Sequence, residues 1–318
     1  MKRDRSFGKK KFSVFNFVLA VLLAVYTVSI FLSIYFIVVN AFKDVADYLG
    51  GYNSVSGKSY VGENVFGVPR AGSLTFYNIK EILSCAIHGR RNGISYDFSM
   101  IPDIFLYSVV YAVGGAFFAA IVPCITAYFV AKFNYKFSKI LYATVIVVII
   151  VPIIGNLPST YRVLHALNLY DNIFGMFLCK AHFVNMWFLV FYAAFKSVPN
   201  DYMEAAYIDG ASEFRVMVSI MLPLIRNALF TVVLIFFVDL WNDYQTPALF
   251  LPSHRTFAYV VSTFQDMSET KTSDTVWQLK EVPFQMAASA IMTLPTLLLF
   301  VAFREKLMGN LTMGGIKG

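Results

Sequence analysis

The sequence has few charged residues for its length. Asp, Glu, Lys and Arg together make up 14% of the 318 residues, whereas apolar residues make up 58%. A soluble domain of this size needs about 25% charged residues to cover its surface. The composition therefore excludes an ordinary soluble domain and indicates that much of the surface lies in lipid.

Cysteine and histidine are also scarce, at three and four residues. Cys85, Cys124 and Cys179 have neither metal-site nor disulfide spacing, and the histidines form no paired-ligand motif. Residues 57–59 resemble the end of a phosphate-binding loop, but Tyr52 stands where that loop requires glycine. No nucleophile, base and orienting group can be assembled from spacing. The sequence predicts no enzyme activity, no metal site and no cofactor bound by this chain.

The net charge of +7 is concentrated at the ends of apolar segments. Six basic residues crowd the first thirteen positions: Lys2, Arg3, Arg5, Lys9, Lys10 and Lys11. This pattern is typical of anchoring at an anionic membrane face. A nucleic-acid-binding module would instead gather its basic residues on one folded surface, so we expect a lipid bilayer and no nucleic acid as partner.

Six apolar segments meet or approach the length of about 20 residues that a bilayer-spanning helix requires. They are residues 14–39, 104–130, 140–157, 174–195, 228–250 and 284–303. The third segment is short, and the fourth contains Lys180, His182 and Asn185. The sequence predicts an all-α integral membrane protein with six transmembrane helices.

The orientation of these spans follows from the basic residues in the short loops. With six spans, four basic segments lie on the same side, which is the cytoplasm by the positive-inside rule. They are the tail 1–13, the link with Lys132, Lys136 and Lys139, the link 197–223 and the tail 304–318. The opposite side receives the long loop 40–103. This loop either folds as a small cap or stays mobile, and the sequence leaves both possibilities open.

The link 197–223 carries the strongest local signals. A helix-start signal precedes residues 202–209, Gly210 breaks this helix, and a second short helix is expected over 212–220. The physical pattern leaves two roles open. The segment lies on the lipid surface as an amphipathic helix, or it is a docking surface for a partner.

This link resembles the EAA loop of the permease subunits of bacterial ABC importers. The matching residues are Glu204, Ala205, Ala206, Asp209, Gly210, Ala211, Ile220, Leu222 and Pro223. In that family the loop is a coupling helix, which docks on the ATPase subunit and passes ATP-driven closure to the membrane helices. The resemblance implies that Glu204 makes polar contacts at this joint and that Gly210 provides the turn. Asn227 departs from the family, where many relatives have proline.

The C-terminal segment resembles the tail of the maltose-type permease, which inserts between two ATPase subunits. The matching positions are Gly314, Gly315, Lys317 and Gly318. The resemblance implies a type I importer permease with both termini in the cytoplasm, located in the bacterial cell membrane. It also implies a second permease subunit, an ATPase dimer that holds ATP and Mg, and an extracytoplasmic solute-binding protein. The substrate would be a carbohydrate, most simply an oligosaccharide.

Two other classes remain as rivals. A stand-alone channel or ion-coupled carrier needs paired membrane charges or inverted repeats. A membrane-embedded enzyme needs an acid, base or metal cluster near one membrane face. Neither pattern is clear in the sequence, so both rank below the importer subunit.

Three polar residues lie in or near the fifth predicted span: Asp239, Asn242 and Asp243. A carboxylate within hydrocarbon costs at least ~2.5–3.5 kcal/mol, so it should face protein or water. We expect Asp239 to face inward and to mark the translocation path. For Asn242 and Asp243, the same role and a position at the outer interface, beside Trp241 and Tyr244, both remain open.

Overall fold

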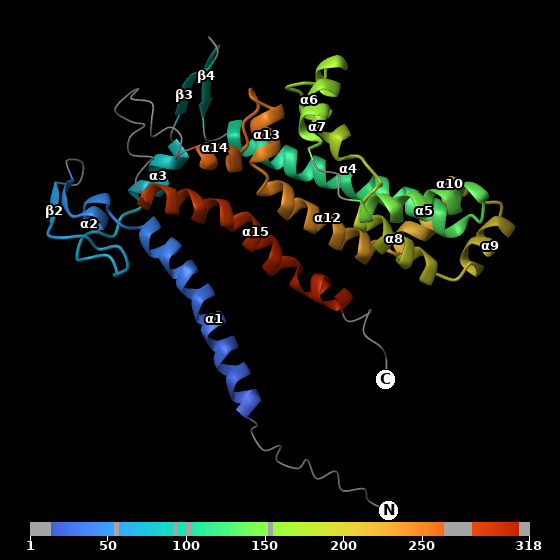
Figure 1. The fold of residues 1–318 in the computed structure, drawn as a ribbon, viewed down its shortest axis with the longest axis horizontal. Coiled ribbons are helices and arrows are strands. Elements are labelled where there is room, and N and C mark those ends of the chain that lie inside the picture. Colours follow the sequence, from blue (N-terminus) through green and yellow to red (C-terminus); the bar gives the residue numbers. More distant parts are fainter. Residues whose placement is uncertain are drawn as a thin grey trace, which may run out of the picture. The chain divides into compact units, whose positions relative to one another are not determined.

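The computed structural model describes residues 14–53, 57–84, 86–91, 94–99, 103–151, 155–263 and 282–311. Helices dominate the fold (Figure 1). The chain divides into two compact units. The first runs to Ile82 and includes the last helix as far as Ile291, and the second holds Leu83 to Thr272 and the rest of the last helix.

The first unit begins with α1 (Val14–Ala41), a helix of 28 residues that is apolar on all sides. Its side chains are exposed along almost the whole length, and only Asn40 and Ala41 are buried. A helix that is hydrophobic all round belongs in lipid or against another protein. The first predicted span is thus a continuous helix of sufficient length.

A small folded segment, residues 42–82, follows α1 and is called the cap. It contains α2 (Val45–Leu49), the antiparallel pair β1 (Gly51–Asn53) and β2 (Lys58–Tyr60), and the start of α3 (Tyr77–Ser84). Asp44 caps the N-terminus of α2 by accepting a hydrogen bond from the Ala46 amide. Of the two possibilities for the long loop, the structure shows a folded cap over this part.

Buried polar side chains hold the cap together. The ammonium group of Lys43, fully buried, donates hydrogen bonds to the carbonyl oxygens of Asn64 (2.7 Å) and Gly67 (2.8 Å). The side-chain amide of Asn78 donates to the carbonyl oxygens of Ala41 (3.1 Å) and Lys43 (2.8 Å). Segments about 20 to 40 residues apart are therefore joined through side chains rather than through a large sheet.

Asp47 is the negative charge within this network. Its carboxylate accepts hydrogen bonds from the Ser73 hydroxyl, the Arg70 amide (3.0 Å) and the Asn64 side-chain amide (3.1 Å). The Arg70 guanidinium lies 3.4 Å away. Burial by itself raises the pKa of Asp47, but these hydrogen bonds and the Arg70 charge outweigh it and hold the pKa below its usual value.

The second unit is built around α4 (Phe105–Lys132), which packs against α7 (Ile173–Lys180), α8 (Met186–Ser197) and α12 (Arg226–Trp241) (Figure 1). Small residues of α4 allow the close approach. A methyl group added at Gly115 would lie only 2.7 Å from the Leu240 side chain. Close approach at small residues is typical of helices that pack within membranes.

The remaining elements complete the second unit. They are the hairpin β3 (Ala86–Arg91) and β4 (Ile94–Ser99), and the helices α5 (Lys136–Ile150), α6 (Leu157–Ala166), α9 (Asp201–Ile208), α10 (Glu213–Val216), α11 (Leu222–Leu224), α13 (Gln245–Phe250), α14 (Phe257–Thr263) and the later part of α15 (Val282–Leu311). The two small hairpins are a departure from the all-α prediction.

Among the described residues, three helices are long and apolar enough to cross a membrane: α1, α4 and the part of α15 up to Arg304. They match the first, second and sixth predicted spans. The other three predicted spans are interrupted. The third ends its helix at Ile150, and the fifth is divided between α12 and α13. The count of six spans stays a prediction.

The fourth predicted span shows why these segments break. Its helix stops at Lys180, and a new helix begins at Met186. Asn185 caps the new helix by accepting a hydrogen bond from the Phe188 amide (3.2 Å), and its own amide donates to the His182 carbonyl (3.1 Å). The polar residues of this span thus satisfy backbone groups at a break, which a continuous helix would not require.

Candidate functional site

The predicted link forms a helix–turn–helix, residues 197–224, called the elbow. The first helix, α9, ends at Ile208, and Gly210 follows with φ of 79°. Glycine adopts this left-handed conformation without steric cost, so the turn depends on this residue. Ser212 caps α10 by accepting a hydrogen bond from the Arg215 amide (3.4 Å). The short helix expected over 202–209 is confirmed within one residue.

After α10 the chain passes through a short π-helix, η2 (Met217–Met221), and α11 into α12. The segment from Glu213 to Leu224 makes an angle of 77° with α12. The bend falls at Ile225, whose φ of −101° and ψ of 11° are not helical. The chain therefore enters α12 through a sharp bend two residues before Asn227.

The two faces of α9 differ in exposure. Met203 and Ala206 are buried against the rest of the second unit. Glu204 and Ala205 are exposed, and Ile208 keeps 86% of its surface accessible. An isoleucine at this exposure, together with exposed Tyr202 and Tyr207, indicates a face to which a partner can bind.

An apolar cluster lies beneath the elbow. It joins α4 and α8 to α9, α10 and η2, through the buried residues Tyr128, Phe195, Met203, Val216, Met217 and Met221. The Tyr128 ring packs edge-on against Phe195, with ring centroids 5.4 Å apart. The elbow is therefore bound to the helices behind it through close-packed side chains.

Lys132, the last residue of α4, makes a polar connection beside this cluster. Its ammonium group donates to the Val198 carbonyl (2.6 Å) and to the side-chain oxygen of Asn200 (3.0 Å). Val198 is the C-cap residue that follows α8, and Asn200 precedes α9.

A second polar cluster surrounds Asp243, at the junction of α12 and α13. Its carboxylate accepts hydrogen bonds from the Tyr111 hydroxyl (2.8 Å) and the Thr246 amide (3.0 Å). The Lys180 ammonium lies 3.3 Å away, and both charged side chains are mostly buried. The cluster therefore links α4, α7 and the end of α12 through an ion pair.

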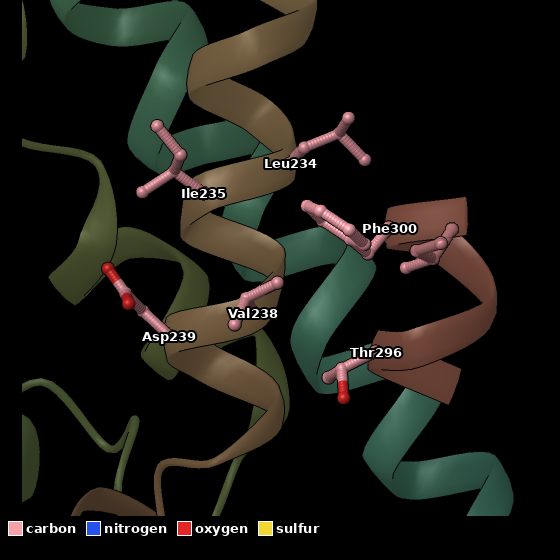
Figure 2. Close-up of a pocket in the computed structure, with 7 residues that line it drawn as sticks. Leu234, Ile235, Val238, Asp239, Thr296 and Phe300 are labelled. Atoms are coloured by element: carbon pink, nitrogen blue, oxygen red, sulfur yellow. The ribbon is translucent and has the colours of Figure 1, made fainter. Parts of the chain in front are cut away.

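Asp239, one turn earlier in α12, lies in a different environment. It borders a cavity of about 190 Å³ between α12 and α15, together with Leu234, Ile235, Val238, Thr296, Leu299 and Phe300. In Figure 2 its carboxylate projects from α12 on the side away from Thr296 and Phe300. Typical ligand pockets measure about 300–1,000 Å³, so this small, apolar cavity has no features of a sugar site by itself.

A family model described as "Binding-protein-dependent transport system inner membrane component" matches residues 123–307, which include the elbow and the helices on both sides. The chain belongs to this family. The matched range is more than half of the chain.

Several characterised permeases are similar to this one. The trehalose/maltose transport system permease protein MalG of Thermococcus litoralis is 28% identical over 204 residues, which cover 62% of this chain and 69% of that protein. The melibiose/raffinose/stachyose import permease protein MelC of Bacillus subtilis is 23% identical over 244 residues, covering 76% and 86%.

The fold is similar to that of a chain in the crystal structure of a bacterial ABC transporter involved in the import of the acidic polysaccharide alginate. The TM-score is 0.68, at 17% sequence identity, and the match covers 94% of this permease and 98% of that chain. At this identity the similarity concerns the fold.

The predicted coupling residues of the permease divide into two groups. Glu204, Ala205, Asp209, Gly210 and Pro223 are exposed. Ala206 is buried, and Ala211, Ile220 and Leu222 pack against the apolar cluster. The first group is accessible to a partner, whereas the second attaches the elbow to its own chain.

The other predicted site residues differ from one another in burial and in contacts. Asp243 is engaged in the ion-pair cluster, and Asn242 is exposed, with its amide donating to the Val238 carbonyl (2.8 Å) one turn back. Asp239 is exposed. The C-terminal positions Gly314, Gly315, Lys317 and Gly318 lie outside the described residues.

Sequence reasoning missed Lys132, Tyr111 and Thr246 as site residues. The sequence does contain a signal for the ion pair of Lys180, because a lysine within an apolar segment requires a counter-charge. Lys132 was assigned only to the basic residues that set orientation, and its two acceptors are 66 and 68 residues away. Within the described parts of the chain, no three His, Cys, Asp or Glu side chains gather as a metal site requires.

Proposed function

We propose that this chain is the membrane-spanning permease subunit of an ATP-driven, solute-binding-protein-dependent importer of a carbohydrate, in the bacterial cell membrane. Family membership supports the importer class. The substrate class is supported by the printed names of relatives, which include trehalose, maltose, melibiose and diacetylchitobiose. Because these sugars have two or more rings, we extend the proposal to an oligosaccharide.

The proposed topology has six spans, with both termini in the cytoplasm. The interrupted helices are compatible with it, because breaks at membrane depth are tolerated where protein surrounds them. The helices α7, α8 and α12 pack on α4. Phe250 of α13 belongs to the same apolar cluster as Tyr111 and Ala112 of α4. Each pair, α7 with α8 and α12 with α13, would then form one span.

The observation that carries the proposal is the elbow itself. It has an exposed face with Glu204, Ala205 and Ile208, and its opposite face is packed on the ends of α4 and α8. A partner ATPase that binds the exposed face can therefore move the membrane helices through the buried face. The alternative role, a helix lying flat on lipid, gives no function to the acidic side chains of Asp201 and Glu204.

The proposed importer class implies further partners for this chain. A second permease subunit would cover part of the exposed surface of α1, and an extracytoplasmic binding protein would deliver the sugar. ATP and Mg would be held by an ATPase dimer, against which Gly314, Gly315, Lys317 and Gly318 would insert. We propose Asp239, with Asn242 and Asp243 nearby, for the translocation path.

A test replaces Gly210 by valine in the assembled complex. Valine at φ of 79° is strained, so the elbow turn should be lost and ATP-dependent uptake of labelled trehalose, maltose or melibiose into proteoliposomes should fall by about tenfold or more. Gly155→Val is the matched control, because Gly155 has φ of 81° and equally open surroundings outside the elbow. Unchanged coupling of uptake to ATP hydrolysis in Gly210→Val would contradict the proposal.

The ion pair between Lys180 and Asp243 is the observation that favours a rival, a stand-alone ion-coupled carrier. Paired charges within a membrane often mark ion pathways. The rival predicts uptake by the purified chain alone, driven by a proton or sodium gradient. Uptake that requires co-purified ATPase subunits and ATP would exclude it.

A further inference from the structure

Lys132 occupies the point where three helices meet. It is the last residue of α4, and its ammonium group bonds to the end of α8 at the Val198 carbonyl (2.6 Å) and to the start of α9 at the Asn200 side chain (3.0 Å). The last carbonyl groups of a helix have no partner within the helix and carry partial negative charge. Lys132 thus places a positive charge at the C-terminal end of α8.

The bond to Asn200 is informative because it replaces a bond that would serve α9 alone. Asparagine at a helix N-cap ordinarily accepts a hydrogen bond from an amide of its own helix. Here the side chain of Asn200 makes no such bond and accepts from Lys132 instead. A positive charge at the N-terminus of a helix also opposes the helix dipole. The arrangement therefore serves the connection between α4 and α9 more than the stability of α9.

The two ends of α9 are consequently attached differently. Its N-cap residue, Asn200, is bonded to Lys132 of α4, and its last residue leads into the glycine turn at Gly210. Further along, α4 packs on α7, α8 and α12. A displacement applied to α9 would be passed at one end to the central helix of the unit and absorbed at the other end by the turn.

We propose that Lys132 is a positioning residue for coupling, which makes the start of α9 and the end of α4 move as one body. This inference rests on the proposed function of the elbow. It assigns the direction of transmission: from the start of α9 into α4, rather than along the chain through η2 into α12.

The test measures the distance between two spin labels in the assembled complex. One is at Tyr202→Cys in α9, and the other is at Lys136→Cys, the first residue of α5, which a short link joins to the end of α4. The three native cysteines are replaced first. Both labelled positions are exposed. With Lys132 present, we expect one narrow distance distribution that is the same without nucleotide and with ATP and vanadate. In Lys132→Gln the distribution should broaden, and its mean should shift between the two states.

Two variants separate a positioning role from a general structural one. Lys132→Arg keeps the positive charge and the donors, so it should restore the narrow distribution, whereas Lys139→Gln, at an exposed lysine of the same region, should leave it unchanged. If Lys132→Gln does not assemble, Asn200→Ala decides, because it removes one acceptor and leaves the lysine. A narrow, state-independent distribution in Lys132→Gln, or in Asn200→Ala where the first fails to assemble, would overturn the inference.

Gly210→Val separates this inference from the proposed function. Loss of ATP-coupled uptake in Gly210→Val, with an unaltered distance in Lys132→Gln, would reject the role of Lys132 and retain the elbow as the coupling element. Full coupled uptake in Gly210→Val would reject the coupling role itself.

Discussion

In the cap, charged and amide side chains are buried among backbone carbonyl groups, whereas the side chains buried beneath the elbow are largely apolar. Lys43, Asp47 and Asn78 are each almost completely inaccessible in the cap. Beneath the elbow, the fully buried side chains include those of Phe195 and Met221. The cap is too small for an apolar core of its own, so directed hydrogen bonds replace close packing.

The two kinds of interior respond differently to change. A buried polar network is stable only if each member is satisfied, and one missing partner leaves a desolvated group unpaired. An apolar cluster loses contacts in proportion to the atoms removed. The elbow can therefore adjust its packing during movement, whereas the cap is expected to be either intact or lost.

The largest effect is expected for Lys43→Met in the cap. This change leaves the carbonyl groups of Asn64 and Gly67 without their donor and removes a buried positive charge that interacts with Asp47. Removal of one partner from a buried charged network costs about 3–5 kcal/mol. Hydrogen exchange of the amides in α2 should become much faster.

Lys58→Met is the matched control, because Lys58 is an exposed lysine of the same cap, whose ammonium group donates to the Gly72 carbonyl at the surface. Surface substitutions of this kind change stability by about 0.5 kcal/mol or less. Equal exchange rates in the two variants would mean that the buried lysine is no more important than the exposed one, and the contrast between cap and elbow would be lost.

A smaller effect is expected from acid, which removes the charge of Asp47 but leaves its neighbours in place. The native pKa of Asp47 lies below its usual value of 3.8. The unfolded state therefore binds a proton first as the pH falls, so the stabilisation is complete above the usual value and is lost as the pH passes through the lowered native pKa.

Proteolysis of the cap, followed from pH 7 to pH 3, measures this effect. Cleavage within residues 57–82 should increase only below about pH 4, and Asp47→Asn should remove this dependence on pH. The elbow should show no matching transition from its apolar cluster. A cap that resists cleavage equally at both pH values would contradict the assigned role of Asp47.

The same contrast explains how far the sequence predicted the fold. The long apolar segments of α1, α4 and α15 were evident, because length and hydropathy are local properties. The elbow was also predicted, from the helix-start signal and Gly210. These features depend on residues close together in the chain.

The features that were not predicted depend on distant residues. The cap forms because Lys43 reaches a carbonyl 21 residues away and Asp47 reaches a hydroxyl 26 residues away, and no periodicity records this. The break after Lys180 depends on Asn185 as a helix cap and on Asp243, 63 residues later, as an ion partner. A hydropathy window averages over such residues, so the segment is predicted as one continuous apolar span.

Phe195→Leu probes the apolar side of the comparison with a moderate expected effect. Phe195 is fully buried beneath the elbow and packs edge-on against Tyr128. A smaller apolar side chain keeps most of the burial and leaves no polar group unpaired, so the loss should be about 1–1.5 kcal/mol. Thermal unfolding of the complex measures it, with Phe137→Leu, at an exposed phenylalanine, as control. A loss as large as that of Lys43→Met would remove the contrast.

The smallest effect is expected for Ser212→Ala, at the N-cap position of α10 in the elbow. The Ser212 hydroxyl accepts one hydrogen bond, from the Arg215 amide, and the bond is long, at 3.4 Å. Loss of an N-cap side chain typically costs about 1 kcal/mol, and the low end of the range, about 0.5 kcal/mol, applies to a long, exposed bond. Ser219→Ala, an exposed serine in η2, should have no measurable effect.

Exchange of the Arg215 amide reports on this bond directly. It should become faster in Ser212→Ala, while the amides of η2 keep their native rates, because the apolar residues Val216 and Met217 still anchor the second helix of the elbow. Loss of protection throughout the elbow would show instead that a single local hydrogen bond maintains it. The elbow would then resemble the cap in its dependence on polar contacts, and Lys132 would be one of several such connections.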